Sequence, residues 1–190
     1  LSVSADGRRL YYSKRTESNR HGSRVNDIYV LDLPEPHSKK KAKEKRLTRD
    51  LRAKDPAISP DGTTIAAIVN GDGTNQVVLL DREGKLLRQL TQAAHGTQYY
   101  KPSWSPDGRA LLLGVFRGLS RDIALLEVET GEERLLAVSP ADERDPCFIP
   151  GEEAILFSSD RSGIFNLYRL DLGRNELTQV TNVVGGAFYP

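Results

Sequence analysis

Apolar residues in this chain gather in runs of strand length, not at helical spacing. The stretches 76–80 and 110–116 are rich in Leu and Val, and Gly, Pro, Asp and Asn residues bound such runs throughout. Apolar residues spaced three and four positions apart, as an amphipathic helix requires, are hard to find. The pattern therefore predicts an all-β chain.

A short turn motif recurs along the chain. Copies of Ser-x-Asp-Gly begin at Ser4, Ser59 and Ser105, and a degenerate copy begins at Ile149, so that the spacings are 55, 46 and 44 residues. A proline stands three residues before each of the last three turns, and another ends the chain; these are Pro56, Pro102, Pro146 and Pro190. The turn is therefore part of a repeat of about 45 residues.

The sequence predicts four strands in each repeat. In the third copy, Ser103 to Ser105 leads into the turn, and strands follow at 110–116, 122–128 and 133–138. At the turn, the Asp accepts local backbone hydrogen bonds and the Gly adopts the left-handed conformation of a bulged hairpin. These structural turn residues are Asp6, Gly7, Asp61, Gly62, Asp107 and Gly108.

A four-stranded repeat of this length is typical of a β-propeller blade. We expect blades at about 1–55, 56–101, 102–145 and 146–189. An open arc of four blades would expose two apolar sheet faces. We therefore expect a fragment of a longer chain with a six- or seven-bladed ring; a closed four-bladed ring and self-association through the end blades stay open as alternatives.

The repeat resembles the TolB-like propeller repeat, because a Ser-Pro-Asp-Gly hairpin, an apolar strand and an Ile-Tyr-x-x-Asp strand such as 28–32 follow one another. The resemblance covers nearly all 190 residues. It implies a non-catalytic module that binds a protein or peptide in the bacterial envelope, typically the periplasm. The same repeats occur in gating propellers of prolyl-oligopeptidase-type serine peptidases, which would imply the cytoplasm. The regular blade lengths favour the binding module.

Composition agrees with an ordered domain, with 38% hydrophobic and 28% charged residues. The net charge of +1 argues against a general polyanion binder, so we expect no nucleic-acid partner. No apolar run approaches 18 residues, so we expect no membrane insertion. The single Cys147 lies in an expected strand, which favours a buried, inert thiol.

The loops that join second to third strands lie on the same face as the connections between blades, and we name this the top face. Aromatic and Arg side chains are common interface anchors. Packing between blades and capping of turns are the alternative roles, and for Asp160 we favour a structural turn role. The candidate partner-binding residues on the top face are Tyr99, Tyr100, Lys101, Arg117, Arg121, Arg161, Phe188 and Tyr189.

One segment, 34–46, departs from the repeat. It carries six basic and two acidic residues, a local charge of +4 that leaves −3 for the rest of the chain. A contact with nucleic acid or anionic lipid is conceivable. The run has no interleaved aromatic residue for base stacking. The sequence therefore favours a solvated extension of a hairpin.

Catalytic motifs find little support. His21, His37 and His95 fall in loops of different repeats, and there is no Gly-x-Ser-x-Gly elbow, His-Glu-x-x-His motif or cysteine pair. The Gly71 to Gly73 stretch reads as a hairpin turn, and no Asp-x-Asp-x-Asp array suggests a calcium site. We expect a chain without catalytic residues, metal or cofactor.

Overall fold

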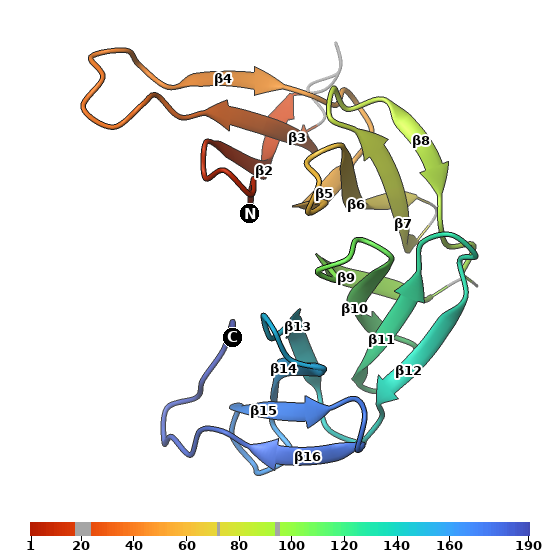
Figure 1. The fold of residues 1–190 in the computed structure, drawn as a ribbon. Helices are drawn as coiled ribbons and strands as arrows, with labels where there is room; N and C mark the ends of the chain where they lie inside the picture. The colour runs from red at the N-terminus through yellow and green to blue at the C-terminus, as the bar shows by residue number, and fades with distance from the viewer. Residues whose placement is uncertain (18–23, 72, 94–95) are drawn as a thin grey trace. The chain divides into compact units, whose positions relative to one another are not determined.

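The computed structural model describes residues 1–17, 24–71, 73–93 and 96–190. The regular elements of this part are sixteen strands (Figure 1). Within it, no helix is long and apolar enough to cross a membrane. The chain divides into two compact units, Leu1–His95 and Gly96–Pro190.

The first unit holds two antiparallel four-stranded sheets, which we number blades 1 and 2. In each, consecutive strands pair with one another. Blade 1 comprises β1 (Ser2–Val3), β2 (Arg9–Glu17), β3 (Arg24–Asp32) and β4 (Lys43–Arg46). Blade 2 comprises β5 (Ala53–Ile58), β6 (Thr64–Gly71), β7 (Thr74–Asp81) and β8 (Leu86–Gln89).

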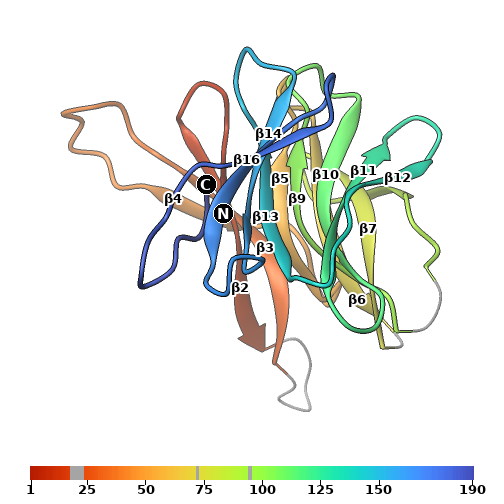
Figure 2. The same ribbon diagram turned by 90° about the horizontal axis from the view of Figure 1, so that it is seen from below.

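The second unit repeats this arrangement in blades 3 and 4. Figure 2 shows β9, β10, β11 and β12 in that order across blade 3. Four repeats of four antiparallel strands confirm the all-β prediction. Blade 3 comprises β9 (Gln98–Trp104), β10 (Ala110–Phe116), β11 (Arg121–Glu127) and β12 (Glu133–Ala137). Blade 4 comprises β13 (Glu143–Phe148), β14 (Ala154–Ser159), β15 (Asn166–Asp171) and β16 (Glu176–Gln179).

The core of each unit lies between its two blades. Side chains that alternate along a strand share one face of the sheet, and in the second unit Leu112 and Ile123 of blade 3 form one cluster with Ile155, Phe157 and Tyr168 of blade 4. In the first unit, the corresponding cluster is Tyr11, Ile28, Val30, Ile58, Ile65 and Leu80. Burying each large apolar side chain contributes about 2 kcal/mol, so the blades of a unit stabilise one another.

The predicted turn chemistry is confirmed. At the corner between β9 and β10, Ser105 Oγ donates to Asp107 Oδ1 at 2.6 Å, and the Arg109 amide donates to the same oxygen at 3.1 Å. The Gly108 amide donates to Ser105 O at 2.9 Å, with φ of +72°. The hydrogen bond from Ser105 and the one from the Arg109 amide lower the pKa of Asp107. The same bonds recur around Asp6 with Gly7 and around Asp61 with Gly62.

The fourth turn has a different type. Here Gly151, with φ of +78°, occupies the third corner position after Pro150, and the Glu152 amide donates to Ile149 O at 3.2 Å. A positive φ at that position with proline before it is the signature of a type II turn. Because Gly-Glu replaces Asp-Gly, the residue with the left-handed backbone stands one position earlier in this turn than in the other three turns.

A second side-chain motif closes the outer strands. In blade 2, Thr91 Oγ1 donates to Gln76 Oε1 at 2.7 Å and accepts a hydrogen bond from the Val77 amide at 2.9 Å. The pairs Thr48 with Asp27 and Thr181 with Asn166 make the equivalent contacts. These threonines follow the fourth strand of blades 1, 2 and 4 and tie it to the third strand of the same blade.

The inner strands begin earlier than the sequence suggests. Strands β5, β9 and β13 begin three or four residues before their prolines, Pro56, Pro102 and Pro146. Blade boundaries placed at the prolines therefore fall a few residues after the first strand of each blade has begun. The repeated proline lies inside that strand and not at its beginning.

Candidate functional site

The first strands of blades 2, 3 and 4 each contain a bulge at their proline. In blade 3, Tyr100 pairs with Gly114 and Ser103 pairs with Leu112, so Lys101 and Pro102 together oppose a single residue. Blades 2 and 4 show the same two-against-one register at Asp55-Pro56 and at Asp145-Pro146. A bulge leaves the extra residue outside the ladder. A proline, which has no amide hydrogen, is therefore tolerated there.

The residue before each of these prolines has a left-handed backbone. The φ angles are +50° at Asp55, +47° at Lys101 and +51° at Asp145, and Tyr189, before Pro190, has +57°. For a residue with a Cβ atom this conformation costs about 1–2 kcal/mol. Four non-glycine residues in one repeat position therefore carry backbone strain that glycine would relieve, which is a pattern associated with functional positions.

The four positions share a backbone geometry but not a side chain. They carry two carboxylates, an ammonium and a phenol. In the second unit, the Lys101 ammonium lies 5.5 Å from the centroid of the Tyr189 ring. Lys101 is exposed, and Tyr189 is 73% exposed. Lys101 and Asp145 lie in bulges, and Tyr189 lies outside the strands but has the same backbone conformation before a proline. We name these three the bulge residues of the second unit; they place an ammonium, a carboxylate and an aromatic ring at equivalent positions of successive repeats.

On the top face of the second unit, arginine guanidinium groups stack on aromatic rings and hold the loops together. The Arg121 guanidinium lies 4.4 Å from the Tyr100 ring centroid, and it pairs with Asp142 at 3.8 Å. Arg144 lies 4.7 Å from the Phe165 ring. Phe165 also contacts Phe188, with ring centroids 4.8 Å apart. The structure thus brings the predicted residues Tyr100, Arg121 and Phe188 to one edge, with Arg144 and Phe165 beside them.

Tyr99 does not belong to an exposed surface. Its side chain is buried, with 3% of the residue exposed, and its hydroxyl donates to Glu133 Oε2 at 2.6 Å. Burial and this hydrogen bond raise the pKa of Tyr99 to about 12. Arg117 pairs with the other oxygen of Glu133 at 2.6 Å. The prediction that Tyr99 contacts a partner is therefore corrected, because residues alternate between the two faces of β9 and Tyr99 lies on the packed face.

Arg161 is exposed, as a partner-binding residue must be, and it also makes contacts within the fold. Its guanidinium donates to Glu143 Oε1 at 2.5 Å and to Ser159 Oγ at 3.1 Å. It lies 5.0 Å from the Tyr168 ring centroid. Glu143 is fully buried, so Arg161 neutralises a charge that cannot reach water. Asp160, as expected, stabilises structure, since its Oδ1 accepts a hydrogen bond from the Asp142 amide at 2.9 Å.

Two carboxylate oxygens are buried without a partner in the described part of the chain, Asp122 Oδ1 and Glu143 Oε2. Burial raises the pKa of Asp122. Among the described residues, no group of three His, Cys, Asp or Glu side chains lies close enough to hold a metal ion. Burial likewise raises the pKa of the Cys147 thiol, which is half-buried.

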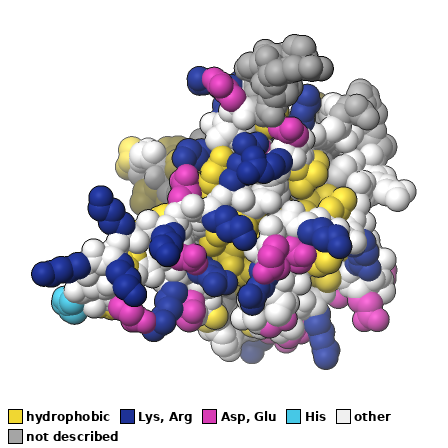
Figure 3. Space-filling model, turned by 90° about the horizontal axis from the view of Figure 1, so that it is seen from above, with side chains coloured by type: hydrophobic (Ala, Val, Ile, Leu, Met, Phe, Trp, Pro, Cys, Tyr) yellow, Lys and Arg dark blue, Asp and Glu magenta, His cyan; other side chains and the backbone are white. Residues whose placement is uncertain are grey.

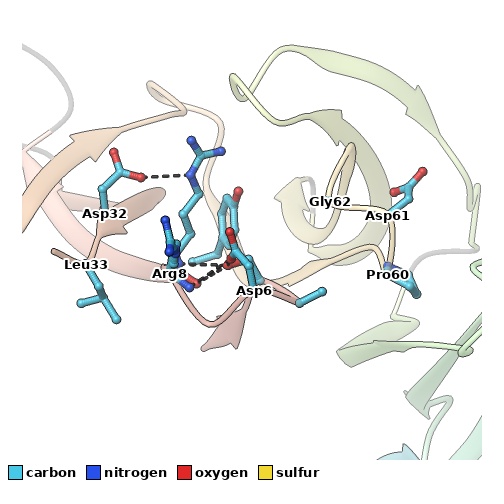
Figure 4. A pocket seen from close by; sticks show the side chains of 11 residues that line it. Asp6, Arg8, Asp32, Leu33, Pro60, Asp61 and Gly62 are labelled. Atoms are coloured by element: carbon cyan, nitrogen blue, oxygen red, sulfur yellow. Dashed lines mark hydrogen bonds and ion pairs between the residues drawn. The ribbon is translucent and has the colours of Figure 1, made fainter. Parts of the chain in front are cut away.

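A polar cleft of about 550 Å³ opens in the first unit between the turns of Asp6 and Asp61 (Figure 4). Its charged groups are already paired, since Arg9 donates to Asp32 at 3.0 Å and Arg8 pairs with Glu35 at 2.7 Å.

Some residues considered from the sequence lie outside the described residues, namely His21, Asp72 and His95. His37 is exposed in the loop between β3 and β4. Sequence reasoning named Lys101 and Tyr189 but missed Asp55 and Asp145. The available signal was their shared place immediately before the repeated proline.

Structural comparison identifies the fold. A TolB-type protein from Agrobacterium tumefaciens matches the whole chain and 63% of its own chain, with a TM-score of 0.80 and 23% identity. TolB from Acinetobacter baumannii matches 96% of this chain and 43% of its own, with a TM-score of 0.74 and 17% identity. A puromycin hydrolase matches 94% of this chain and 30% of its own, with a TM-score of 0.70 and 14% identity. The blades are thus those of a TolB-like β-propeller.

Two curated relatives are longer than this chain. The uncharacterized peptidase YuxL of Bacillus subtilis is 27% identical over 82% of this chain, which spans 28% of that protein. The uncharacterized protein Atu1656 of Agrobacterium fabrum is 26% identical over 72% of this chain, which spans 46% of that protein. A family model described as the lipoprotein LpqB β-propeller domain matches residues 46–145, more than half of the chain. The chain therefore belongs to the family of the LpqB lipoprotein β-propeller domain.

Proposed function

We propose that this chain is a non-catalytic binding module that holds a protein or peptide partner at the bulge residues Lys101, Asp145 and Tyr189. The observation that carries the proposal is the constant left-handed backbone with variable side chains at this repeat position. A fold that keeps a strained geometry at four successive repeat positions while varying the side chain presents a set of positions suited to recognition. An ammonium, a carboxylate and an aromatic ring together match the polar and apolar groups of a peptide.

Binding by selected peptides tests the proposal. Peptides are selected by phage display against the full-length protein and then measured against Lys101→Gly and Tyr189→Gly variants. Glycine accepts the left-handed backbone, so only the side chain is removed. We expect each variant to weaken binding at least about tenfold. The matched control is Asp107→Asn, at the opposite edge of the blade, which we expect to bind as the parent does.

Failure to select any peptide would overturn the proposal. So would equal binding by the parent and both glycine variants. Far-UV circular dichroism and thermal unfolding of every variant distinguish loss of a contact from loss of the fold.

A second candidate function is a gate that restricts substrate entry to a peptidase domain elsewhere in a longer protein. The match to YuxL, which is described as a peptidase, favours it. In that case, full-length protein should cleave short peptides, and Lys101→Gly should change KM for long peptides more than for short ones. Absence of peptidase activity in the full-length protein would eliminate this candidate.

The two candidates also differ in cellular location. The description of the family as a lipoprotein domain and the likeness to TolB support an envelope or periplasmic location for a binding module. Cell fractionation with antibodies against the chain measures this directly. Recovery in the cytoplasm would favour the peptidase gate.

A further inference from the structure

The connection between β3 and β4 is longer than its counterparts in the other blades. It spans residues 33–42, whereas the corresponding connections span 82–85, 128–132 and 172–175. Figure 1 shows that the β3–β4 hairpin extends well past β2 in the first unit. We name residues 33–45 the basic hairpin. The projection separates its charges from the packed part of the blade.

The acidic residues of the basic hairpin pair with residues outside it. Glu35 pairs with Arg8 at 2.7 Å, and Glu44 pairs with Lys14 at 3.0 Å. The adjoining Arg46 turns inward, where it pairs with the fully buried Asp27 at 2.5 Å. Asp32, the cross-strand neighbour of Lys43, pairs with Arg9 at 3.0 Å, so among the described residues no carboxylate forms an ion pair with a hairpin lysine.

Five lysines of the hairpin are exposed, and their side chains make no ion pair or hydrogen bond with the residues that the structure describes. Because strand side chains alternate, Lys43 and Lys45 lie on the face of β4 opposite Glu44. Figure 3 shows Lys and Arg side chains projecting beside the histidine drawn in cyan, with Asp and Glu side chains next to them. The five residues are Lys39, Lys40, Lys41, Lys43 and Lys45.

The chemistry of the basic hairpin favours an anionic surface over a nucleic acid as its binding partner. Lysine ammonium groups are compact point charges. They lack the planar guanidinium with which arginine makes bidentate hydrogen bonds to bases or phosphates. Base stacking needs a free aromatic ring. The nearby rings of Tyr12 and Tyr29 are stacked on each other, with centroids 6.0 Å apart, and the Tyr12 hydroxyl donates to Glu44. A cluster of four to eight basic residues is typical of segments that bind anionic lipid headgroups.

We propose that the basic hairpin docks the protein peripherally on an anionic phospholipid bilayer, with the five lysines facing the headgroup phosphates. The hairpin has no exposed aromatic side chain that would enter the hydrocarbon region. Attraction is therefore electrostatic, and the bound state depends on ionic strength.

Vesicle co-sedimentation of the full-length protein tests the proposal. The probes are vesicles of phosphatidylcholine alone and of equimolar phosphatidylcholine and phosphatidylglycerol. We expect binding to the second only, with most of it lost between about 50 mM and about 500 mM salt. The test variant changes all five hairpin lysines to Gln, and we expect its partition coefficient to fall on the order of a hundredfold.

A matched control removes the same number of charges elsewhere. It changes five exposed basic residues of other loops and strands to Gln, and we expect at most about a tenfold loss. The control positions are Arg15, Arg49, Lys85, Arg134 and Arg174. Equal loss in both variants would show that total charge, and not the hairpin, governs binding.

A second assay decides against nucleic acid. Fluorescence anisotropy with labelled single-stranded and duplex DNA is measured at the same ionic strengths. Hairpin-dependent DNA binding without vesicle binding would overturn the proposal, and so would the absence of binding to anionic vesicles. Circular dichroism and thermal unfolding confirm that the five-lysine variant keeps its fold, since all five side chains are exposed.

Discussion

Lys101 and Tyr189 meet at one edge of the second unit, with the ammonium 5.5 Å from the ring centroid. Both residues have a left-handed backbone directly before a proline. The contact therefore joins two side chains whose backbones are held in a costly conformation by their repeats. This relationship links the blade architecture to the proposed binding site and leads to the first prediction.

Backbone strain at Lys101 should be visible in stability. We expect Lys101→Gly to be more stable than Lys101→Ala by about 1 kcal/mol, because glycine adopts a left-handed backbone without a Cβ clash. Both variants lose the same ammonium group, so their difference isolates the backbone. Urea denaturation measures the free energies of unfolding.

The control for this comparison is Arg109, which follows the turn and has no positive φ. At that position we expect the opposite order, with Gly less stable than Ala by about 0.5 kcal/mol. If the Ala variant at position 101 were as stable as the Gly variant, the backbone at this position would not be strained.

The exposed Arg161 and the buried Glu143 should behave as a coupled pair. Removing Arg161 leaves the fully buried Glu143 carboxylate without its cation. We expect Arg161→Ala to lower the free energy of unfolding by about 3 kcal/mol. The double variant with Glu143→Ala should cost less than the sum of the single variants.

Arg174→Ala, an exposed change of the same kind, should cost less than about 0.5 kcal/mol. Strict additivity of the Arg161 and Glu143 variants would show that the two side chains do not interact.

The turn carboxylate of Asp107 should make stability depend on acid pH. Hydrogen bonds from Ser105 and the Arg109 amide lower its pKa in the folded chain. A lowered pKa contributes stability above the unfolded value of about 3.9, and this contribution is lost as the pH falls through the folded pKa. We expect Asp107→Asn to be less stable than the parent at neutral pH, by less than about 1 kcal/mol.

This difference should disappear in acid, where both chains carry a neutral group at position 107. Urea denaturation at a series of pH values measures it, and Glu176→Gln at an exposed strand position is the control for net charge. A difference that persists unchanged in acid would mean that the charge of Asp107 has no part in the turn.

Tyr99 should contribute to the fold through its hydroxyl. We expect Tyr99→Phe to lower the free energy of unfolding by about 1 kcal/mol, since Glu133 loses a hydrogen-bond donor. The pKa of about 12 favours the neutral phenol in the folded chain. The contribution of the Tyr99 hydroxyl to the free energy of unfolding is therefore complete below the unfolded pKa of about 10 and is lost as the pH rises toward the folded pKa.

Thermal unfolding at neutral pH compares this variant with Tyr189→Phe, which changes an exposed ring. We expect no measurable effect from the second change. Equal stability of the parent and Tyr99→Phe would show that the Glu133 contact is energetically neutral.

Strands and turns could be predicted because their signals are local. The run 110–116 is a strand with the expected bounds. The Ser-x-Asp-Gly corners place their hydrogen bonds within five residues of sequence. Local spacing of apolar and turn residues is sufficient for features of this range.

The bulges could not be read from the chain in the same way. A residue before proline ordinarily prefers an extended backbone, so nothing in the sequence around Lys101 indicates a left-handed conformation. The conformation follows from pairing with β10, where two residues must oppose one. The repeated proline marked the place but not the geometry.

The sequence by itself determined the all-β repeat, the chemistry of its corners and the candidate loops. Only the tertiary structure decided which candidates are exposed. Tyr99 is buried against Glu133, 34 residues away, whereas Lys101 and Tyr189 stay at the surface. Arg161 is also exposed, and Glu143, 18 residues away, fixes the position of its guanidinium. Exposure depends on neighbours brought together from distant parts of the chain, and neither periodicity nor composition encodes those contacts residue by residue.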